Sequence, residues 1–136
     1  MDLVHSKSVR LLLIASTTHG TATGNYDGSS IDFQSDSAKG DGYYGYSDGL
    51  HTVSWQVTSF VGDITIQASL VEIPTSTDWF DVSMTDPAGT TYTSPYDGST
   101  AQTAHVAYNF TGNFVNVRAS VKNFTAGTIN KLRFNY

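Results

Sequence analysis

Thr52-Val53-Ser54-Trp55-Gln56-Val57-Thr58 alternates polar and apolar side chains with a period of two. Successive side chains of a β-strand point to opposite faces of a sheet, so this alternation predicts a strand with one buried and one exposed face. An apolar run before this stretch and five alternating runs after it predict further strands, at 9–15, 64–70, 80–84, 104–110, 115–121 and 132–136. No comparable stretch has the three- and four-residue spacing of an amphipathic helix.

Residues that favour turns lie between the predicted strands. Asp27-Gly28, Asp48-Gly49 and Asp97-Gly98 combine an Asp side chain that bonds nearby amides with a Gly that accepts a positive φ. Asp86-Pro87-Ala88-Gly89 adds the fixed φ of Pro. Short strands separated by such turns are typical of a sandwich or barrel. We therefore predict an all-β fold, a single antiparallel, jelly-roll-like β-sandwich of about eight strands.

The whole chain, 1–136, is predicted to form this one domain, because its length is typical of a single domain. Region 20–49 alternates weakly and is rich in Gly and Tyr. We expect one or two short strands around Ile31-Asp32-Phe33 within long, ordered loops, and a flexible linker is the alternative. The Tyr residues of this region favour order over disorder.

A short phrase recurs three times, at 59–64, 109–114 and 123–129. Each copy contains, in this order, a polar residue, a Phe, one or two further residues, a Gly, a polar residue and a bulky apolar residue. We predict three hairpin corners, in which one strand ends, the Gly turns the chain and the next strand begins. The Phe of each copy is expected to cap the edge of the core.

The composition excludes several classes of protein. The net charge is −5 and only seven Lys and Arg are present, whereas a nucleic-acid binder needs a cluster of basic residues on one face. The longest apolar run, Leu11–Ala15, is too short to cross a bilayer or to form the core of a signal peptide. We therefore expect synthesis in a cytoplasm, no membrane partner and no nucleic-acid partner. Without cysteine, the fold does not rely on disulfides.

Low charge also bears on assembly. A quarter of the residues are Ser or Thr, and they mostly fall at the outward positions of the predicted strands. Lys side chains commonly protect sheet edges from pairing with other chains, and these uncharged faces have little of that protection. The composition therefore favours a protein with close neighbours over a free enzyme.

Motifs of the common enzyme classes are missing from the sequence. It has no Gly-x-Ser-x-Gly elbow, no phosphate-binding Gly-rich loop, no His-Glu-x-x-His and no thiol nucleophile. His51 and His105 are both predicted at outward positions beside strands. We expect no catalytic residues and no cofactor, and a small glycan-cleaving enzyme is the weakest of the alternatives.

Five Asp residues in Gly-rich loops offer the hard oxygen ligands that calcium prefers, but their spacing does not match a known calcium loop. We expect them to form turns and predict no metal site. These residues are Asp27, Asp36, Asp41, Asp48 and Asp97.

Aromatic residues on loops are the remaining candidates for a binding site. Tyr and Trp are enriched at protein–protein interfaces, where an apolar body and a polar tip both find partners. Two alternatives stay open: the rings cover the ends of the sandwich, or they form a platform on which sugar rings stack. The candidate binding residues are Tyr43, Tyr44, Tyr46, Trp79 and Tyr96, with Trp79 on the face opposite its apolar neighbours.

Several stretches together resemble small virion structural proteins of tailed bacteriophages, particularly those that infect marine cyanobacteria. The matching stretches are 11–16, 24–30, 61–70, 78–82, 108–118 and 123–129. The resemblance covers most of the chain. Asn116 is a departure, because the pattern leads us to expect a large aromatic residue there.

This resemblance implies a non-enzymatic, jelly-roll-like protein built into a virion, either as a head decoration or in the neck, tail or baseplate. Its implied partners are other virion proteins and further copies of itself in a homo-oligomer. The alternative function is a carbohydrate-binding module or receptor-reading sandwich on the particle surface, with surface glycans as partners.

Overall fold

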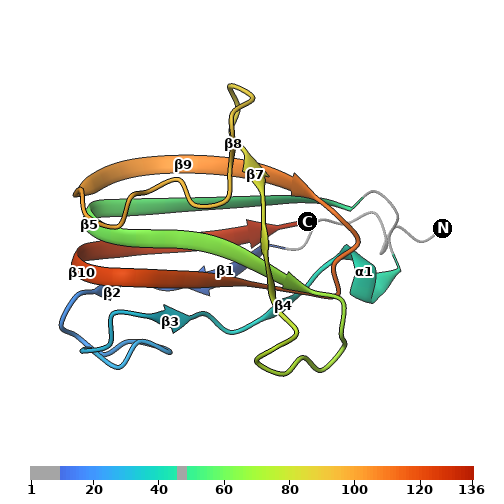
Figure 1. Ribbon diagram of the computed structural model, residues 1–136, viewed down its shortest axis with the longest axis horizontal. Helices are drawn as coiled ribbons and strands as arrows, with labels where there is room; N and C mark the ends of the chain where they lie inside the picture. The colour runs from blue at the N-terminus through green and yellow to red at the C-terminus, as the bar shows by residue number, and fades with distance from the viewer. Residues whose placement is uncertain (1–9, 46–48) are drawn as a thin grey trace.

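The computed structural model describes residues 10–45 and 49–136. The described chain contains one short helix and ten strands (Figure 1). These elements are β1 (Arg10–Ile14), β2 (Thr17–Thr18), β3 (Phe33–Gln34), β4 (Ala38–Lys39), α1 (Asp41–Tyr44), β5 (Leu50–Ser69), β6 (Phe80–Val82), β7 (Met84–Thr85), β8 (Thr91–Tyr92), β9 (Gln102–Thr111) and β10 (Asn116–Asn135). All the strands belong to one antiparallel sheet. The predicted all-β, antiparallel class is confirmed.

The two long strands, β5 and β10, pair along almost their whole lengths. Fully extended, a strand of 20 residues would span roughly 65 Å. The start of β5 pairs with the end of β9, however, and the end of β5 pairs with the start of β10. Since only residues 112–115 join β9 to β10, the two ends of β5 must lie close together. The β5–β10 pair therefore folds back on itself, and the bend lies at the left of Figure 1.

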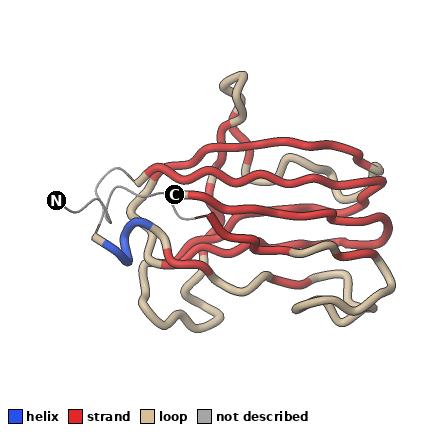
Figure 2. Tube along the Cα trace, turned by 180° about the vertical axis from the view of Figure 1, so that it is seen from behind, coloured by secondary structure: helices blue, strands red, loops and turns tan. Residues whose placement is uncertain are grey.

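This folded pair makes the two layers of a sandwich (Figures 1 and 2). The first layer contains β1, the C-terminal half of β10, the N-terminal half of β5, and β9. The second contains β3, β4, the N-terminal half of β10, the C-terminal half of β5, and β6. The core lies between the layers, with inward side chains such as Trp55, Ile66, Ala119 and Leu132 almost fully buried.

The predicted division into short strands is wrong at two places, because β5 and β10 are each one continuous strand. The predicted strands 52–58 and 64–70 are both parts of β5, and 115–121 and 132–136 both lie largely within β10. Two of the three predicted hairpin corners, 59–64 and 123–129, are bends inside these strands. Bulges absorb each bend, with a positive φ at Ser59, Asn123 and Gly127 and shifts in the pairing register. The third, 109–114, contains the connection from β9 to β10, and the Phe residues of all three phrases are buried as predicted.

Two further predictions about strand residues are wrong. His51 was predicted to point outward, but it alternates in step with the inward-facing Val53 and Trp55. Its side chain therefore points into the core and is 0% exposed. Leu70 lies one residue beyond the end of β5, where the alternation no longer holds, and its side chain is 64% exposed. His105 is exposed, as expected.

Candidate functional site

Helix α1 is fixed to the end of the sandwich opposite the bend (Figure 1). The Gly42 amide donates to the Phe114 carbonyl at 2.8 Å, and the Asp41 amide donates to Nε2 of the buried His51 at 3.3 Å. A Cβ at Gly42 would collide with the carbonyl of Asn113, so only Gly permits this close approach. The His51 ring stacks on Phe110, with centroids 5.0 Å apart and an interplanar angle of 7°. His51 is therefore part of the support for α1.

This support holds two of the predicted binding residues on the surface. Tyr43 and Tyr44 are both exposed, with their rings in edge contact at 5.0 Å. Tyr44 also stacks on Tyr136 at 5.4 Å, and the Lys39 ammonium lies 4.8 Å from the Tyr43 ring centroid. Tyr46 lies outside the described residues.

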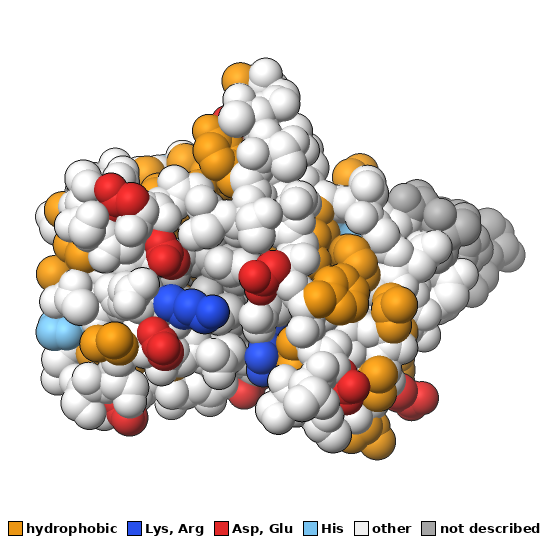
Figure 3. Space-filling view, in the orientation of Figure 1, with side chains coloured by type: hydrophobic (Ala, Val, Ile, Leu, Met, Phe, Trp, Pro, Cys, Tyr) orange, Lys and Arg blue, Asp and Glu red, His pale blue; other side chains and the backbone are white. Residues whose placement is uncertain are grey.

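Apolar side chains next to α1 remain exposed and form a cluster that we name the end patch. Ile73 is 83% exposed and Leu70 is 64% exposed, and Tyr43 and Leu70 line one hollow together with Gly42, Glu72 and Val115. Figure 3, in the orientation of Figure 1, shows hydrophobic side chains gathered on the right half of the visible surface, towards the end that carries α1. The end patch consists of Tyr43, Leu70, Val71, Ile73 and Phe80.

A polar clamp beneath the end patch fixes the loop after β5. The fully buried Asn116 donates from Nδ2 to the carbonyls of Val71 at 2.7 Å and Glu72 at 3.2 Å. Lys39 Nζ donates to Asn116 Oδ1 at 3.1 Å and reaches the Glu72 carbonyl at 3.5 Å. Asn116 thus bonds the loop that presents the patch, a contact that an aromatic residue at this position would not make.

Trp79 lies on the outer face of the second layer. It is half-buried, and the Arg118 guanidinium lies 4.2 Å from its ring centroid. Arg118 Nε donates to Gln67 Oε1 at 2.9 Å, and Gln67 in turn donates to Asp81 at 3.1 Å. Partial burial lowers the pKa of the Arg118 guanidinium from its usual value. Trp79 is therefore held in a polar network on the sheet surface.

Tyr96 lies at the margin of the core. Its hydroxyl accepts a hydrogen bond from Trp55 Nε1 at 2.9 Å, and its ring also packs 6.0 Å from Phe60. Burial raises the pKa of the Tyr96 hydroxyl, and the bond from Trp55 partly offsets this shift. Burial and the neighbouring tyrosines raise the pKa of Tyr108 to about 12. The structure therefore places Tyr96 in the packing beside the bend and Tyr43 and Tyr44 at the far end.

Two of the Asp residues weighed as calcium ligands form turns, as expected. Asp27 accepts bonds from the side chain and amide of Ser30 and from the amide of Ser29, and these bonds lower its pKa to about 2. Asp97 makes the equivalent bonds with Thr100 and Ser99, which hold its pKa well below the usual range. Within 10–45 and 49–136, no three potential His or carboxylate ligands lie together in a group that could hold a metal ion.

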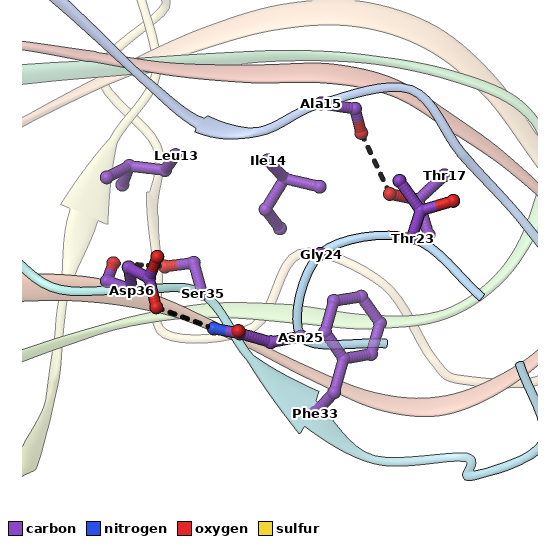
Figure 4. A pocket seen from close by; sticks show the side chains of 10 residues that line it. All are labelled: Leu13, Ile14, Ala15, Thr17, Thr23, Gly24, Asn25, Phe33, Ser35 and Asp36. Atoms are coloured by element: carbon purple, nitrogen blue, oxygen red, sulfur yellow. Dashed lines mark hydrogen bonds between the residues drawn. The ribbon is translucent and has the colours of Figure 1, made fainter. Parts of the chain in front are cut away.

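A small cavity lies between the edges of the two layers, next to β1 and β3. It has a volume of about 100 Å³, which is room for a few water molecules. Figure 4 shows its lining, in which Asn25 Nδ2 donates to Asp36 at 3.0 Å and Thr17 donates to the Ala15 carbonyl at 2.8 Å. Its walls carry no aromatic platform apart from the buried Phe33.

The sequence does not predict the end patch, because Leu70 fits the apolar alternation of β5 and therefore reads as a buried residue. Ile73 lies outside any alternating stretch. The residue types alone, three branched apolar residues within 70–73 followed by Pro74, were the available signal. None of the described residues form a helix that could span a membrane, because α1 has only four residues.

No protein-family model matches the chain, and no curated protein matches it. Among solved structures, the chain is similar to the SPBc2 prophage-derived protein YomS, with a TM-score of 0.60 and 12% sequence identity. The match covers 95% of this chain and 91% of that chain. At this identity, the likeness shows a common fold over nearly the full length of both proteins.

Proposed function

We propose that this protein is a non-enzymatic structural protein of a tailed-phage virion that assembles through protein–protein contacts. It would act as a head decoration or as a component of the neck, tail or baseplate, in a phage of the kind that infects marine cyanobacteria. The sequence resemblance supports this proposal, and so does a common fold with a prophage-derived protein.

The end patch is the observation that carries the proposal. Monomeric soluble proteins seldom expose contiguous apolar clusters, and such clusters commonly mark interaction sites. Here Asn116 bonds the backbone carbonyls of Val71 and Glu72, and Lys39 bonds Asn116, so the loop that carries part of the patch is anchored to the sheet. A preformed apolar surface of this kind fits another virion protein, because little ordering is needed when the two surfaces meet.

Binding to particles tests this role of the patch. Ile73→Asp puts a charge at the most exposed residue of the end patch, and Ile31→Asp makes the same change at a residue that is 48% exposed and lies towards the bend. Phage particles that lack the protein are incubated with each purified variant and sedimented. The wild type and Ile31→Asp should sediment with the particles, and Ile73→Asp should not. A wild type that stays in the supernatant contradicts the virion role, and equal binding of Ile73→Asp contradicts the role of the patch.

Glycan binding at the particle surface is the second candidate function. Trp79 and the polar side chains of Arg118, Gln67 and Asp81 lie together, and this combination of a ring with hydrogen-bonding groups is one that sugars can use. A glycan array should then show binding that Trp79→Ala abolishes. Binding that Trp79→Ala and Tyr44→Ala both leave unchanged would exclude these residues as a sugar site.

A further inference from the structure

Strand β9 has one edge that pairs with β5 and a second edge that is almost free. On the second edge, the pairing recorded within the described chain is a single bridge from Asn109 to Thr85 of β7. Residues 102–107 therefore present backbone amides and carbonyls without a strand partner. Figures 1 and 2 both show this strand at the rim of the sheet, with the β7–β8 hairpin standing out beyond it at one point.

This edge lacks the features by which proteins usually protect a free strand. Charged residues, Pro and bulges at the edge prevent pairing with other chains. β9 contains no Lys, Arg, Asp, Glu or Pro, and its pairing with β5 is regular from Ala104 to Thr111. The other rims differ, since β1 has a register shift between Leu12 and Ile14 and β3, β4 and β6 are only two or three residues long.

We infer that the free edge of β9 pairs with β9 of a second copy of this chain, in an antiparallel arrangement about a twofold axis. The inference deepens the proposed function by naming one partner and one surface. A twofold axis perpendicular to the sheet makes the strands antiparallel and keeps the outer faces of both first layers on the same side. The two first layers then form one continuous sheet.

Sequence symmetry favours a second copy and sets the register. With the axis at His105, Ala104 lies opposite Val106 of the other copy on the inner face, so apolar meets apolar. On the outer face, Thr103 lies opposite Ala107, and the two His105 side chains meet at the axis. Shifting the axis to Ala104 would instead place Gln102 opposite Val106. Because β9 contains no Lys, Arg, Asp or Glu, self-pairing brings no ammonium, guanidinium or carboxylate groups against each other.

Two pairs of variants test this dimer, with Gln56 as the matched position. Gln56 lies opposite His105 on the neighbouring strand β5 and faces the same side, but it is away from the free edge. In the dimer, His105→Lys places two ammonium groups against each other and should raise the dissociation constant on the order of tenfold, whereas Gln56→Lys should not. Sedimentation velocity measures both, with circular dichroism to check folding.

Cross-linking provides the second readout, because the natural chain has no cysteine. With a short bifunctional thiol reagent, His105→Cys should give a covalently linked dimer, since directly opposed Cβ atoms in a sheet lie about 4.5–5.5 Å apart, slightly beyond the usual disulfide distance. Gln56→Cys should remain a monomer on a non-reducing gel. A wild type that sediments as a monomer at all concentrations, or a dimer that His105→Lys does not weaken and His105→Cys does not trap, would overturn the inference. If that monomer still binds particles, the dimer fails and the proposed function stands.

Discussion

At the scale of single residues, the buried side chains at the α1 end of the sandwich are supports for the surface. Asn116 bonds the loop that carries the end patch, and His51 packs among aromatic rings while it accepts a bond from α1. A polar side chain in such a position is stabilising only while its partners are present, because an unpaired buried polar group is costly.

Asn116→Ala should therefore destabilise the protein by about 1–3 kcal/mol, since it removes a fully buried amide that bonds the Val71 and Glu72 carbonyls and accepts a bond from Lys39. Asn109→Ala is the matched control, because Asn109 is exposed and its bond with Thr52 can be replaced by water. The control should stay within about 0.5 kcal/mol of the wild type. Urea unfolding measures both free energies, and equal losses would show that Asn116 does not act as a clamp.

At the scale of the elements, the bend of the β5–β10 pair decides the architecture. Both strands pass through the bend while still paired, so one sheet supplies both layers. The two strands approach closely there: Gly127 has a φ of +86°, and a Cβ on it would collide with the Ser59 backbone.

Gly127→Ala should therefore be severely destabilising, because it adds this collision to the strain of a positive φ, which alone costs about 1–3 kcal/mol. Gly89→Ala separates the two effects, since Gly89 has a φ of +92° in the β7–β8 turn with no atom near the added Cβ. Thermal or urea unfolding should show a clearly larger loss for Gly127→Ala. Similar losses in the two variants would mean that the bend tolerates a side chain.

Residue alternation predicted the strands well but could not predict their continuity. The bends at 59–64 and 123–129 contain a polar residue at positive φ and a Gly, which are the same residues that a hairpin turn uses. Local sequence cannot show whether the chain reverses there or merely bends, because the partner strand decides this. The relative positions of the aromatic candidates could not be predicted for a related reason, since Tyr43, Trp79 and Tyr96 lie in three places that only the tertiary structure defines.

At the scale of the whole molecule, the described surface combines a preformed apolar end with an unprotected sheet edge. The two features lie on different parts of the sandwich, so the two proposed contacts, one with another virion protein and one with a second copy, are sterically compatible with separate surfaces. The low overall charge fits this account, since few charges oppose close contact with neighbours.

The central claim is that the chain is a virion protein, and its most direct test is quantitative mass spectrometry of gradient-purified particles of the proposed phage. Intact peptides of the protein should be present in a fixed ratio to the major capsid protein and should remain after washing at high salt, because the proposed contact is apolar. A protein that is abundant in infected cells but absent from purified particles would contradict the account.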